Sequence, residues 1–526
     1  MNVKISGTLS RSAIIWIAAT FLMLPAFAIG HIISYNSFLN VVWSEGFARQ
    51  LFAGNVYPRW LPELNSGAGS PVFYFYGPLP FYLTAPFQLV VGPRETVVLG
   101  IWLMLGLSGQ AFYSFASSFT KTMSAVAASI AYMAMPYHFL VDVWVRSDFG
   151  ELAAYIMIPL CLLCASRLSV RVSWAFGLAA SYSGLLAAHL PSALLFTPFL
   201  VATCAYVAWR GNFVDISLKC MFAACLSVAL AASYVVPAIS YQYMIHADHW
   251  SAYRPSQNPL FSHLQIGIDL LLDAIVANSA LVIAIYAMIL LASGQLLKMI
   301  PWLLIATTVI FFVSPLAAGL WDSLPALFDK VQFSWRSLIL LDVALCMLFA
   351  LSLDGRIVSF HAVLGLMLLN VIAASIVFLV LGARGGPAGL MRRSEPYEDF
   401  LIQARFQPIE YLPSCLTIQG NEWSAGGPER ILARSMKEMT RSQLAVFYYP
   451  FLDARSGGNS VFAYCDAKTG FMSVGPHKGP VTVKPRLLPL ELASDATSLC
   501  SAVIWLIGLF FSTRRPRVSK PKTRMV

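Results

Sequence analysis

The chain alternates between long apolar segments and short polar connections. Runs of about 18 to 25 mostly apolar residues, long enough to cross a bilayer as a helix, recur along the whole sequence. Twelve spans are predicted, near residues 12–33, 95–119, 122–141, 150–167, 173–189, 191–209, 215–239, 272–294, 299–319, 337–353, 358–382 and 495–512. This pattern predicts an all-α polytopic membrane bundle of about twelve transmembrane helices, most of it within residues 1–383.

The segment between the first two spans does not follow this pattern. Residues 55–82, NVYPRWLPELNSGAGSPVFYFYGPLPFY, are rich in Pro, Gly and aromatic residues. The adjoining stretch PLPFYLTAPFQLVVG, residues 78–92, is apolar but short for a span and contains three prolines. Because proline disrupts helix interiors, we expect residues 78–92 to lie in the membrane interface without crossing. Residues 34–94 then form one large first loop.

A different period marks residues 384–494. Alternating or β-branched stretches at 442–450, 461–467, 471–476 and 480–488 are separated by turn sequences such as SGGN and AKTG, which is typical of strands. A small β-rich domain is therefore predicted here, followed by the last span and a basic tail, residues 495–526. Cys415 and Cys465 lie outside the spans, and a disulfide between them requires an oxidising compartment.

Composition places most of the surface of this chain in lipid. Of its 526 residues, 58% are hydrophobic and 11% charged, whereas soluble domains are about 25% charged. The net charge of +10 comes from short basic clusters between apolar segments, which excludes a nucleic-acid-binding surface and follows the positive-inside rule. The basic connections are Lys4 with Arg11, Lys121, Arg167 with Arg171, Arg210, Lys298, Arg356 and the tail 514–526.

This charge alternation predicts the sidedness of every loop. Placing the basic connections in the cytoplasm puts both termini there. It leaves four sizeable segments outside, namely residues 34–94, 240–271, 320–336 and 384–494.

Polar residues that are costly in a membrane gather on the predicted outer side. Residues 34–54 have helical apolar spacing that suggests a shared face for Asn36, Asn40 and Glu45. The other candidates are Arg59 and Trp60 in YPRW, Arg146, Asp148 and Glu151 in VWVRSDFGE, His189 in AHLPS, Asp269 with Asp273, and Arg336 in QFSWR. Since ionisable groups near membrane spans tend to be functional or paired, we expect an outward-facing polar cavity.

Each of these features also has a simpler interpretation. Arg146 with Glu151 is explained equally well by a salt bridge between two helices, and His189 by a cap on a turn. The aromatic residues around Arg59 suit an interfacial belt. Asp342 lies inside the tenth span and is expected to pair with a neighbouring helix.

Several motifs in this order resemble a known family. GNVYPRWLPELNSGAGSPVFYFYGPLPFYL, PYHFLVDVWVRSDFGE, AHLPSA and QFSWR look like the bacterial multi-pass membrane proteins with a 6-pyruvoyl-tetrahydropterin-synthase-related domain. The β-rich segment with FYYP and the final single span are similar to that family and to its larger YfhO-type relatives. The resemblance covers nearly the whole chain and implies a bacterial cytoplasmic (inner) membrane location. The three-histidine zinc site of the soluble pterin synthases is not reproduced in these motifs.

More broadly, the resemblance is to membrane glycosyltransferases of the GT-C type, which use polyprenyl-phosphate-linked sugars. It implies that an acidic residue after the first span acts as a base or binds a divalent metal ion, and that arginines bind the leaving lipid phosphate. The aligned position here is Asn36, which cannot accept a proton. The resemblance therefore implies Glu45, Asp148 and Glu151 as catalytic candidates and, for substrate binding, Asn36, Arg59, Trp60, Arg146, His189 and Arg336.

Three functions are compatible with this reading. The first is glycosyl transfer from a polyprenyl-phosphate sugar at the outer face, without a certain cofactor and with a divalent metal ion left open. The second is transport of a lipid-linked glycan, and the third is a non-catalytic role in envelope assembly through residues 384–494. The lipid bilayer and the lipid-linked sugar are the expected partners; protein partners are left open.

Overall fold

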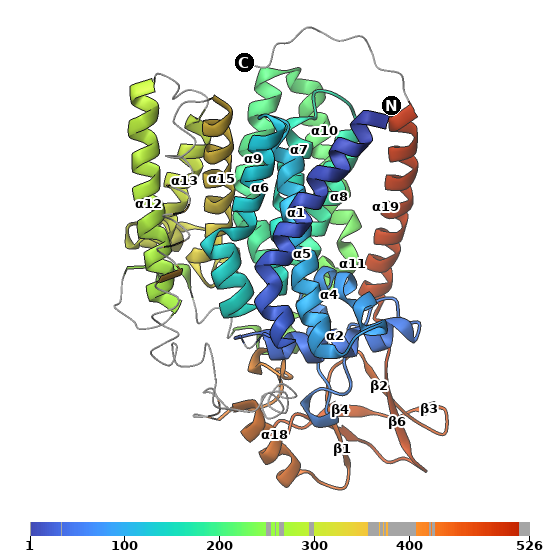
Figure 1. Cartoon of the computed structure of the whole chain (residues 1–526). Coiled ribbons are helices and arrows are strands. Elements are labelled where there is room, and N and C mark those ends of the chain that lie inside the picture. Colours follow the sequence, from blue (N-terminus) through green and yellow to red (C-terminus); the bar gives the residue numbers. More distant parts are fainter. Residues whose placement is uncertain are drawn as a thin grey trace.

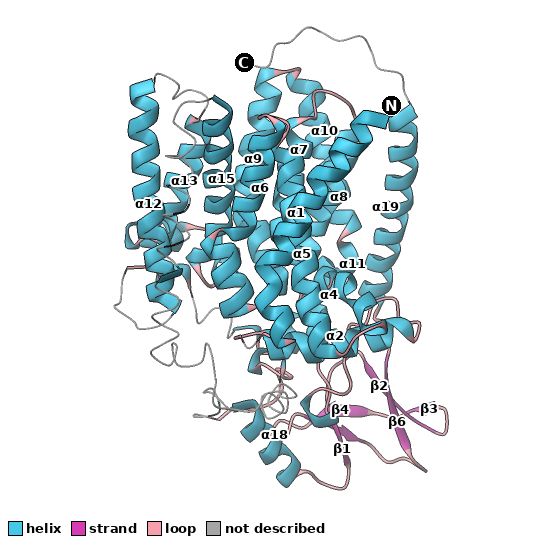
Figure 2. Ribbon diagram, viewed as in Figure 1, coloured by secondary structure: helices cyan, strands magenta, loops and turns pink. Residues whose placement is uncertain are grey.

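The protein is mostly helical, with a small β region near the C-terminal end (Figures 1 and 2). The computed structural model describes residues 2–32, 34–248, 254–257, 259–261, 268–293, 299–355, 407–419, 422 and 427–514, together with residues 365, 368, 372, 375 and 376. Among the described residues, nine helices are long and apolar enough to cross a membrane, or ten if the bent pair Ile300–Val313 and Pro315–Ser323 is one span. The multi-pass helical architecture therefore agrees with the sequence pattern.

The helices of the bundle lie side by side (Figure 1). They are α1 (Asn2–Ile29), α5 (Pro93–Ala116), α6 (Thr122–Ala134), α7 (Phe149–Ser166), α8 (Ser173–Ala188), α9 (Leu190–Arg210), α10 (Phe213–Leu230), α11 (Ala232–Ser240), α12 (Ile268–Ser293), α13 (Ile300–Val313), α15 (Leu338–Gly355) and α19 (Pro489–Arg514). Helix α7 packs against α5, α8 and α9 in the middle of the bundle, whereas α19 leaves most of its apolar surface exposed at the edge.

Short helical elements join these spans. They are the π-helical η3 (Tyr137–Arg146), η4 (Gln242–Met244), η6 (Pro255–Gln257), η8 (Pro315–Ala317), α14 (Ala318–Ser323), η9 (Ala326–Val331), η10 (Ser334–Ser337) and η11 (Ile409–Tyr411). The predicted span 215–239 is broken at Ala231 into α10 and α11. The predicted span 299–319 bends by 82° before Pro315. The predicted span 358–382 lies outside the described residues except for five single positions, so the total of twelve stays a prediction.

Three prolines shape the bundle by freeing carbonyl groups. Proline has no N–H, so the carbonyl four residues before it loses its helical donor, and in lipid that carbonyl needs another one. The carbonyls freed by Pro136 and Pro159 accept hydrogen bonds from His138 Nδ1 at 3.0 Å and from the Tyr132 hydroxyl at 3.1 Å. Pro237, in α11, leaves the Ser233 carbonyl free, and its donor comes from the first loop.

The first loop folds into short helices at one end of the bundle. They are α2 (Ser37–Phe52), η1 (Asn65–Gly67), α3 (Val72–Phe75), α4 (Leu79–Thr84) and η2 (Ala85–Leu89). Elements α4 and η2 have six and five residues, too few to cross a bilayer. The prediction that residues 78–92 do not form a span agrees with this structure.

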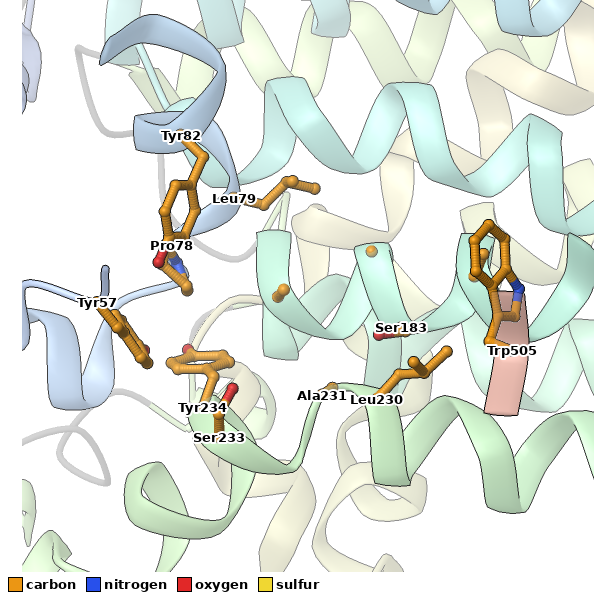
Figure 3. Close-up of a pocket in the computed structure, with 13 residues that line it drawn as sticks. Tyr57, Pro78, Leu79, Tyr82, Ser183, Leu230, Ala231, Ser233, Tyr234 and Trp505 are labelled. Atoms are coloured by element: carbon orange, nitrogen blue, oxygen red, sulfur yellow. The ribbon is translucent and has the colours of Figure 1, made fainter. Parts of the chain in front are cut away.

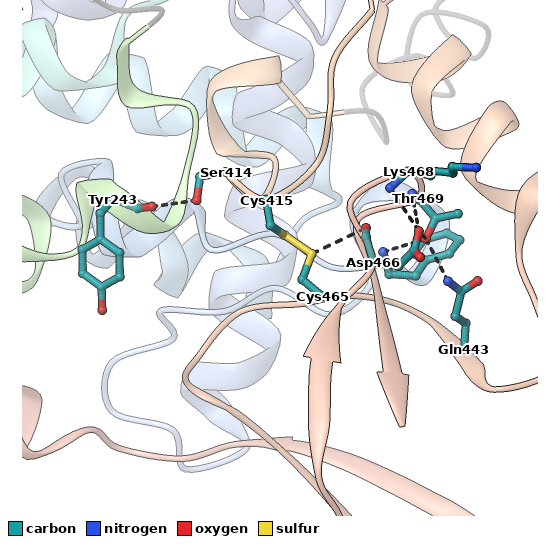
Figure 4. Close-up of a disulfide and its surroundings, with 9 residues drawn as sticks. Tyr243, Ser414, Cys415, Gln443, Cys465, Asp466, Lys468 and Thr469 are labelled. Carbon is teal, nitrogen blue, oxygen red and sulfur yellow. Dashed lines mark hydrogen bonds between the residues drawn. A yellow bond between two sulfur atoms is a disulfide. The ribbon is translucent and has the colours of Figure 1, made fainter. Parts of the chain in front are cut away.

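The β region consists of two small antiparallel sheets. The strands are β1 (Gln443–Phe447), β2 (Leu452–Ser456), β3 (Asn459–Ser460), β4 (Ala463–Cys465), β5 (Phe471–Val474) and β6 (Val481–Pro485), in the orders β1-β5-β4 and β3-β2-β6. Four of these strands fall within the predicted stretches, whereas β2, β3 and helix α18 (Gly427–Glu438) were not predicted. Cys415 and Cys465 form a disulfide that ties the segment before α18 to strand β4 (Figure 4).

The β region and the first loop share one hydrophobic core. The Trp60 ring lies edge-on to Tyr449 and Phe451, with centroid distances of 5.4 and 5.6 Å. The Phe447 amide donates to the Ala68 carbonyl at 2.9 Å, and the Trp43 indole donates to Gln407 at 2.6 Å. We call this end of the bundle the β end. The first turn of α1 and the last turn of α19 lie at the opposite end (Figure 1).

Candidate functional site

Five charged residues meet inside the β end of the bundle. We call Asp142, Arg146, Asp148, Glu151 and Arg336 the charge cluster. Arg146 Nη1 lies 2.9 Å from both Asp142 Oδ1 and Glu151 Oε1. Arg146 Nη2 forms a third ion pair, with Asp148. One guanidinium thus faces three carboxylates, and its ring neighbour is Trp335, 4.7 Å away.

A tight turn brings the first four of these residues together. Helix α6 ends before Pro136, and the chain continues as the π-helical η3, an element often found at functional sites. Ser147 then adopts a left-handed conformation with φ of 50°. Asp148 follows as the N-cap of α7, its carboxylate accepting from the Glu151 amide at 3.0 Å, which satisfies one of the free amides of the new helix.

Arg336 comes from a distant part of the chain. It lies on η10, directly before α15, and its Nε is 3.3 Å from Glu151 Oε1. Its Nη1 donates to the Val331 carbonyl at 2.7 Å. The other oxygen of Glu151 accepts from the Tyr137 hydroxyl at 2.6 Å. Glu151 therefore links two arginines and a tyrosine.

The cluster is buried and has more acids than bases. Asp142 and Glu151 are fully buried. Three carboxylates face two guanidinium groups, and among the described atoms Asp142 Oδ2 is buried without a hydrogen-bond partner. Burial acts to raise the pKa of Asp148, but Arg146 and further cationic neighbours outweigh it and lower this pKa to about 2. Asp148 is therefore ionised at neutral pH.

His189 lies on the edge of the charge cluster. Its Nδ1 is 2.8 Å from the Ser192 hydroxyl, and one ligand atom each of Asp148, Glu151 and His189 lies within 4.8 Å of the other two. Carboxylate and imidazole ligands suit a divalent metal ion. Both carboxylates are already ion-paired with arginines, so the donor types and spacing fit a metal ion but the local charges only partly favour one.

The two asparagines of the first loop support the turn. The Asn36 amide donates to the Arg146 carbonyl at 2.9 Å, and Asn40 Nδ2 donates to the Ser147 carbonyl at 2.6 Å. These bonds attach the start of α2 to the turn that carries the charge cluster. Asn36 thus lies beside Arg146 through its backbone.

Glu45 lies elsewhere, contrary to the expected shared face with Asn36 and Asn40. At 3.6 residues per turn, Glu45 is rotated by about 140° from Asn40 on helix α2. Asn40 is buried, whereas the Glu45 side chain is 44% exposed and pairs with Arg49 at 2.7 Å. The structure therefore does not bring Glu45 into the charge cluster.

Arg59 and Trp60 also lie away from the charge cluster. Arg59 forms a bidentate ion pair with Asp495 and has Nε 3.8 Å from Glu491 Oε1, both on α19. Its Nη2 also donates at 2.9 Å to the Ser233 carbonyl, the group freed by Pro237. We call Arg59, Glu491 and Asp495 the Arg59 clamp. Trp60 is buried in the core shared with the β region.

Two further buried acids are Asp142, which sequence reasoning did not single out, and Asp342, which it did. Asp142 lies one helical turn before Arg146 in an apolar run, a spacing that would have identified it. Asp342, in α15, accepts from the Tyr155 hydroxyl at 2.7 Å, which agrees with the predicted pairing between helices. Asp269 and Asp273 begin α12, and the Asp273 carboxylate accepts from the Phe261 amide at 3.0 Å.

A groove lies beside helix α8, close to His189 (Figure 3). It has a volume of about 370 Å³ and lies between the first loop, α8, the α10–α11 break and α19. Gly77 packs closely against the end of α8, because a Cβ there would lie 2.2 Å from the Ala188 carbonyl. His189, at the edge of the charge cluster, directly follows Ala188. Ala187, directly before Ala188, lines the groove.

A scan against protein-family models finds no match for this chain, and a search of curated proteins finds none either. The family resemblance drawn from the motifs therefore remains an expectation.

Proposed function

We propose that this protein is a glycosyltransferase-like integral membrane protein of the bacterial inner membrane. It uses a polyprenyl-phosphate-linked sugar at the extracytoplasmic face, where it modifies an envelope glycan or lipid. The observation that carries the proposal is the charge cluster, which gathers three acids and two arginines from segments up to 194 residues apart. Buried charges of this kind at a membrane protein's end favour a functional site.

The chemistry assigns different roles to the two kinds of charge. Arg146 and Arg336 would bind the phosphate that leaves the sugar, through charge-assisted hydrogen bonds. Asp148 would orient the acceptor hydroxyl and accept its proton. A pKa of about 2 makes Asp148 a weak base before substrate binds. A phosphate that competes for the arginines would raise this pKa towards the working range, because it removes the charges that lower it.

A divalent ion has a place in this scheme through Asp148, Glu151 and His189, the three residues whose ligand atoms lie within 4.8 Å of one another. Such an ion would polarise a substrate oxygen as a Lewis acid. Glu151 would contribute only after giving up one of its present partners, Arg146, Arg336 or Tyr137.

A non-catalytic role in envelope assembly is the second candidate. The observation that favours it is the position of the acids near the first span. Asn36 stands where the resemblance implies an acid, and Glu45 points away from the charge cluster and pairs with Arg49. A chain that had lost transfer activity would keep Arg146 and its three acids as a structural element.

Transfer assays with purified protein separate these two functions. The wild type, Asp148→Asn and Glu151→Gln are supplied with a panel of polyprenyl-phosphate sugars, and Glu95→Gln, an exposed acid on α5, is the matched control. We expect turnover that falls by about 100-fold or more in the two cluster variants, as for loss of an acid–base group. Glu45→Gln should retain activity.

A cooperative unfolding transition shows whether the purified protein is folded. If folded protein shows no turnover with any donor, the transferase function is excluded and the assembly role is left. Loss of activity in Glu45→Gln but not in Asp148→Asn would move the reacting centre away from the charge cluster.

A further inference from the structure

The groove beside the charge cluster is suited to binding a hydrocarbon chain. Its volume of about 370 Å³ lies within the range of small-molecule sites, about 300 to 1,000 Å³. Pro78, Leu79 and Leu230 contribute apolar wall (Figure 3). Ala180, Gly184 and Ala187, at spacings of four and three residues along α8, provide the space by their small size.

The walls of the groove are fixed by hydrogen bonds that do not depend on a ligand. The hydroxyls of Tyr57, Tyr82 and Tyr234 donate to the carbonyls of Phe73, Val56 and Phe75 at 2.9, 2.7 and 3.0 Å. Trp505 donates to a carbonyl of α8 at 2.8 Å. A preformed wall lowers the entropy cost of binding.

The distance from the Arg59 clamp to the Trp505 end of the groove is close to the depth of one membrane leaflet. Tyr57 and Tyr82 of the first loop lie at one end of the groove, which we call the mouth, and Trp505 of α19 lies at the other end (Figure 3). Asp495 and Trp505 are ten residues apart on this helix, which corresponds to about 15 Å at 1.5 Å per residue. Half of a hydrocarbon core of about 30 Å is the same length. A single acyl chain from the leaflet at the β end would therefore fill the groove.

The charge at the mouth selects the headgroup. Arg59 lies 4.2 Å from the ring of Tyr57, which lines the mouth. In the Arg59 clamp, two acids face this one arginine, so the mouth carries one excess negative charge. Asp495 keeps 34% of its side chain exposed. An anionic phosphate as the nearest group would be repelled, whereas an ammonium group would be attracted.

We propose that this groove binds one acyl chain of an amine-bearing phospholipid, with the ammonium group facing Asp495. Phosphatidylethanolamine is the simplest lipid of this class. The residues that line the groove include none of the charge cluster, and the inference does not depend on glycosyl transfer.

Lipid retention measures this directly. The full-length protein is reconstituted in nanodiscs with equal amounts of phosphatidylethanolamine, phosphatidylglycerol and a polyprenyl phosphate, and lipids that stay bound after transfer to detergent are counted by native mass spectrometry. Ala180→Phe fills the groove, and Ala202→Phe adds the same ring to an exposed position on α9. We expect phosphatidylethanolamine to be retained, and retention to fall about tenfold, equivalent to about 1.4 kcal/mol, in Ala180→Phe alone.

Two further variants make the result interpretable. Ser183→Leu fills less of the groove, and the loss of lipid retention can be measured with this variant if Ala180→Phe does not fold. Asp495→Asn should keep a bound lipid but lose the preference for the amine headgroup. Preferential retention of phosphatidylglycerol or of the polyprenyl phosphate, or retention unchanged by filling the groove in a folded variant, would overturn the proposal. These outcomes require no turnover and are independent of the transfer assay.

Discussion

Two arginines at the β end, Arg146 and Arg59, have the same surroundings by simple measures. Each is 6% exposed, each lies over an aromatic ring, and each faces more carboxylates than it can neutralise. From the sequence, both were expected to bind a lipid phosphate. The structure gives them different partners, so burial and charge alone do not tell what a buried arginine does.

The difference lies in where the partners can go if the arginine is lost. The acids around Arg146 include Asp142 and Glu151, which are fully buried. Arg59 instead ties the first loop to the start of α19 and to the carbonyl freed by Pro237. Of its two acids, Glu491 is buried but lies 3.8 Å from Nε, whereas the main partner, Asp495, reaches solvent. A buried charge without a partner is far more costly than a partly solvated one.

Removal of Arg146 is expected to have the largest effect on stability. Arg146→Met leaves three carboxylates with only Arg336 nearby, so the free energy of unfolding should fall by about 3–5 kcal/mol, the cost of breaking a buried ion pair. Arg146→Lys should recover only part of it, because an ammonium group cannot reproduce the fork of a guanidinium. The measurement is the denaturant midpoint in detergent micelles.

Arg59→Met should cost less than Arg146→Met, about 2 kcal/mol by the same measurement, because water can reach Asp495. A double-mutant cycle with Asp495→Asn checks the reason for the loss. If the clamp is a tie between segments, the double variant should be more stable than the sum of the single losses predicts. Additive losses, or a cost equal to that of Arg146→Met, would remove the distinction between the two arginines.

The sequence predicted the helices well and their interruptions poorly. Nine of the predicted spans, or ten with the bent pair, are helices of the described residues that are long and apolar enough to cross a membrane, since bilayer thickness constrains length. The break at Ala231 and the bend before Pro315 depend on partners elsewhere. Pro237 is visible in the sequence, but the donor to its freed carbonyl is Arg59, which precedes Ser233 by 174 residues.

The candidate site was predicted in part for the same reason. Arg146, Asp148 and Glu151 lie within six residues, so their meeting follows from one turn. Arg336 and His189 were placed with them by predicted sidedness. Arg59 has its acid 436 residues away, and no local pattern indicates that pairing. Glu45 was misplaced for a simpler reason, since a spacing of five residues after Asn40 puts it on another face of the helix.

A titration tests the charge-cluster side of the comparison. Because the pKa of Asp148 is about 2 in the folded protein and about 3.9 in an unfolded chain, its ionised form stabilises the fold above pH 4. This contribution is lost as the pH falls through 2. At about 1.36 kcal/mol per pKa unit, the contribution is about 2–3 kcal/mol.

Asp148→Asn should therefore be less stable than the wild type at pH 7, and the difference in unfolding free energy should shrink steadily between pH 4 and pH 2. Asp322→Asn, at an exposed position of α14, serves as the control and should follow the wild type throughout. A gap that stays constant down to pH 2 would mean that hydrogen bonds to the Asp148 side chain, rather than its charge beside Arg146, hold the turn. In that case the two arginines would differ in burial of their partners but not in electrostatic role.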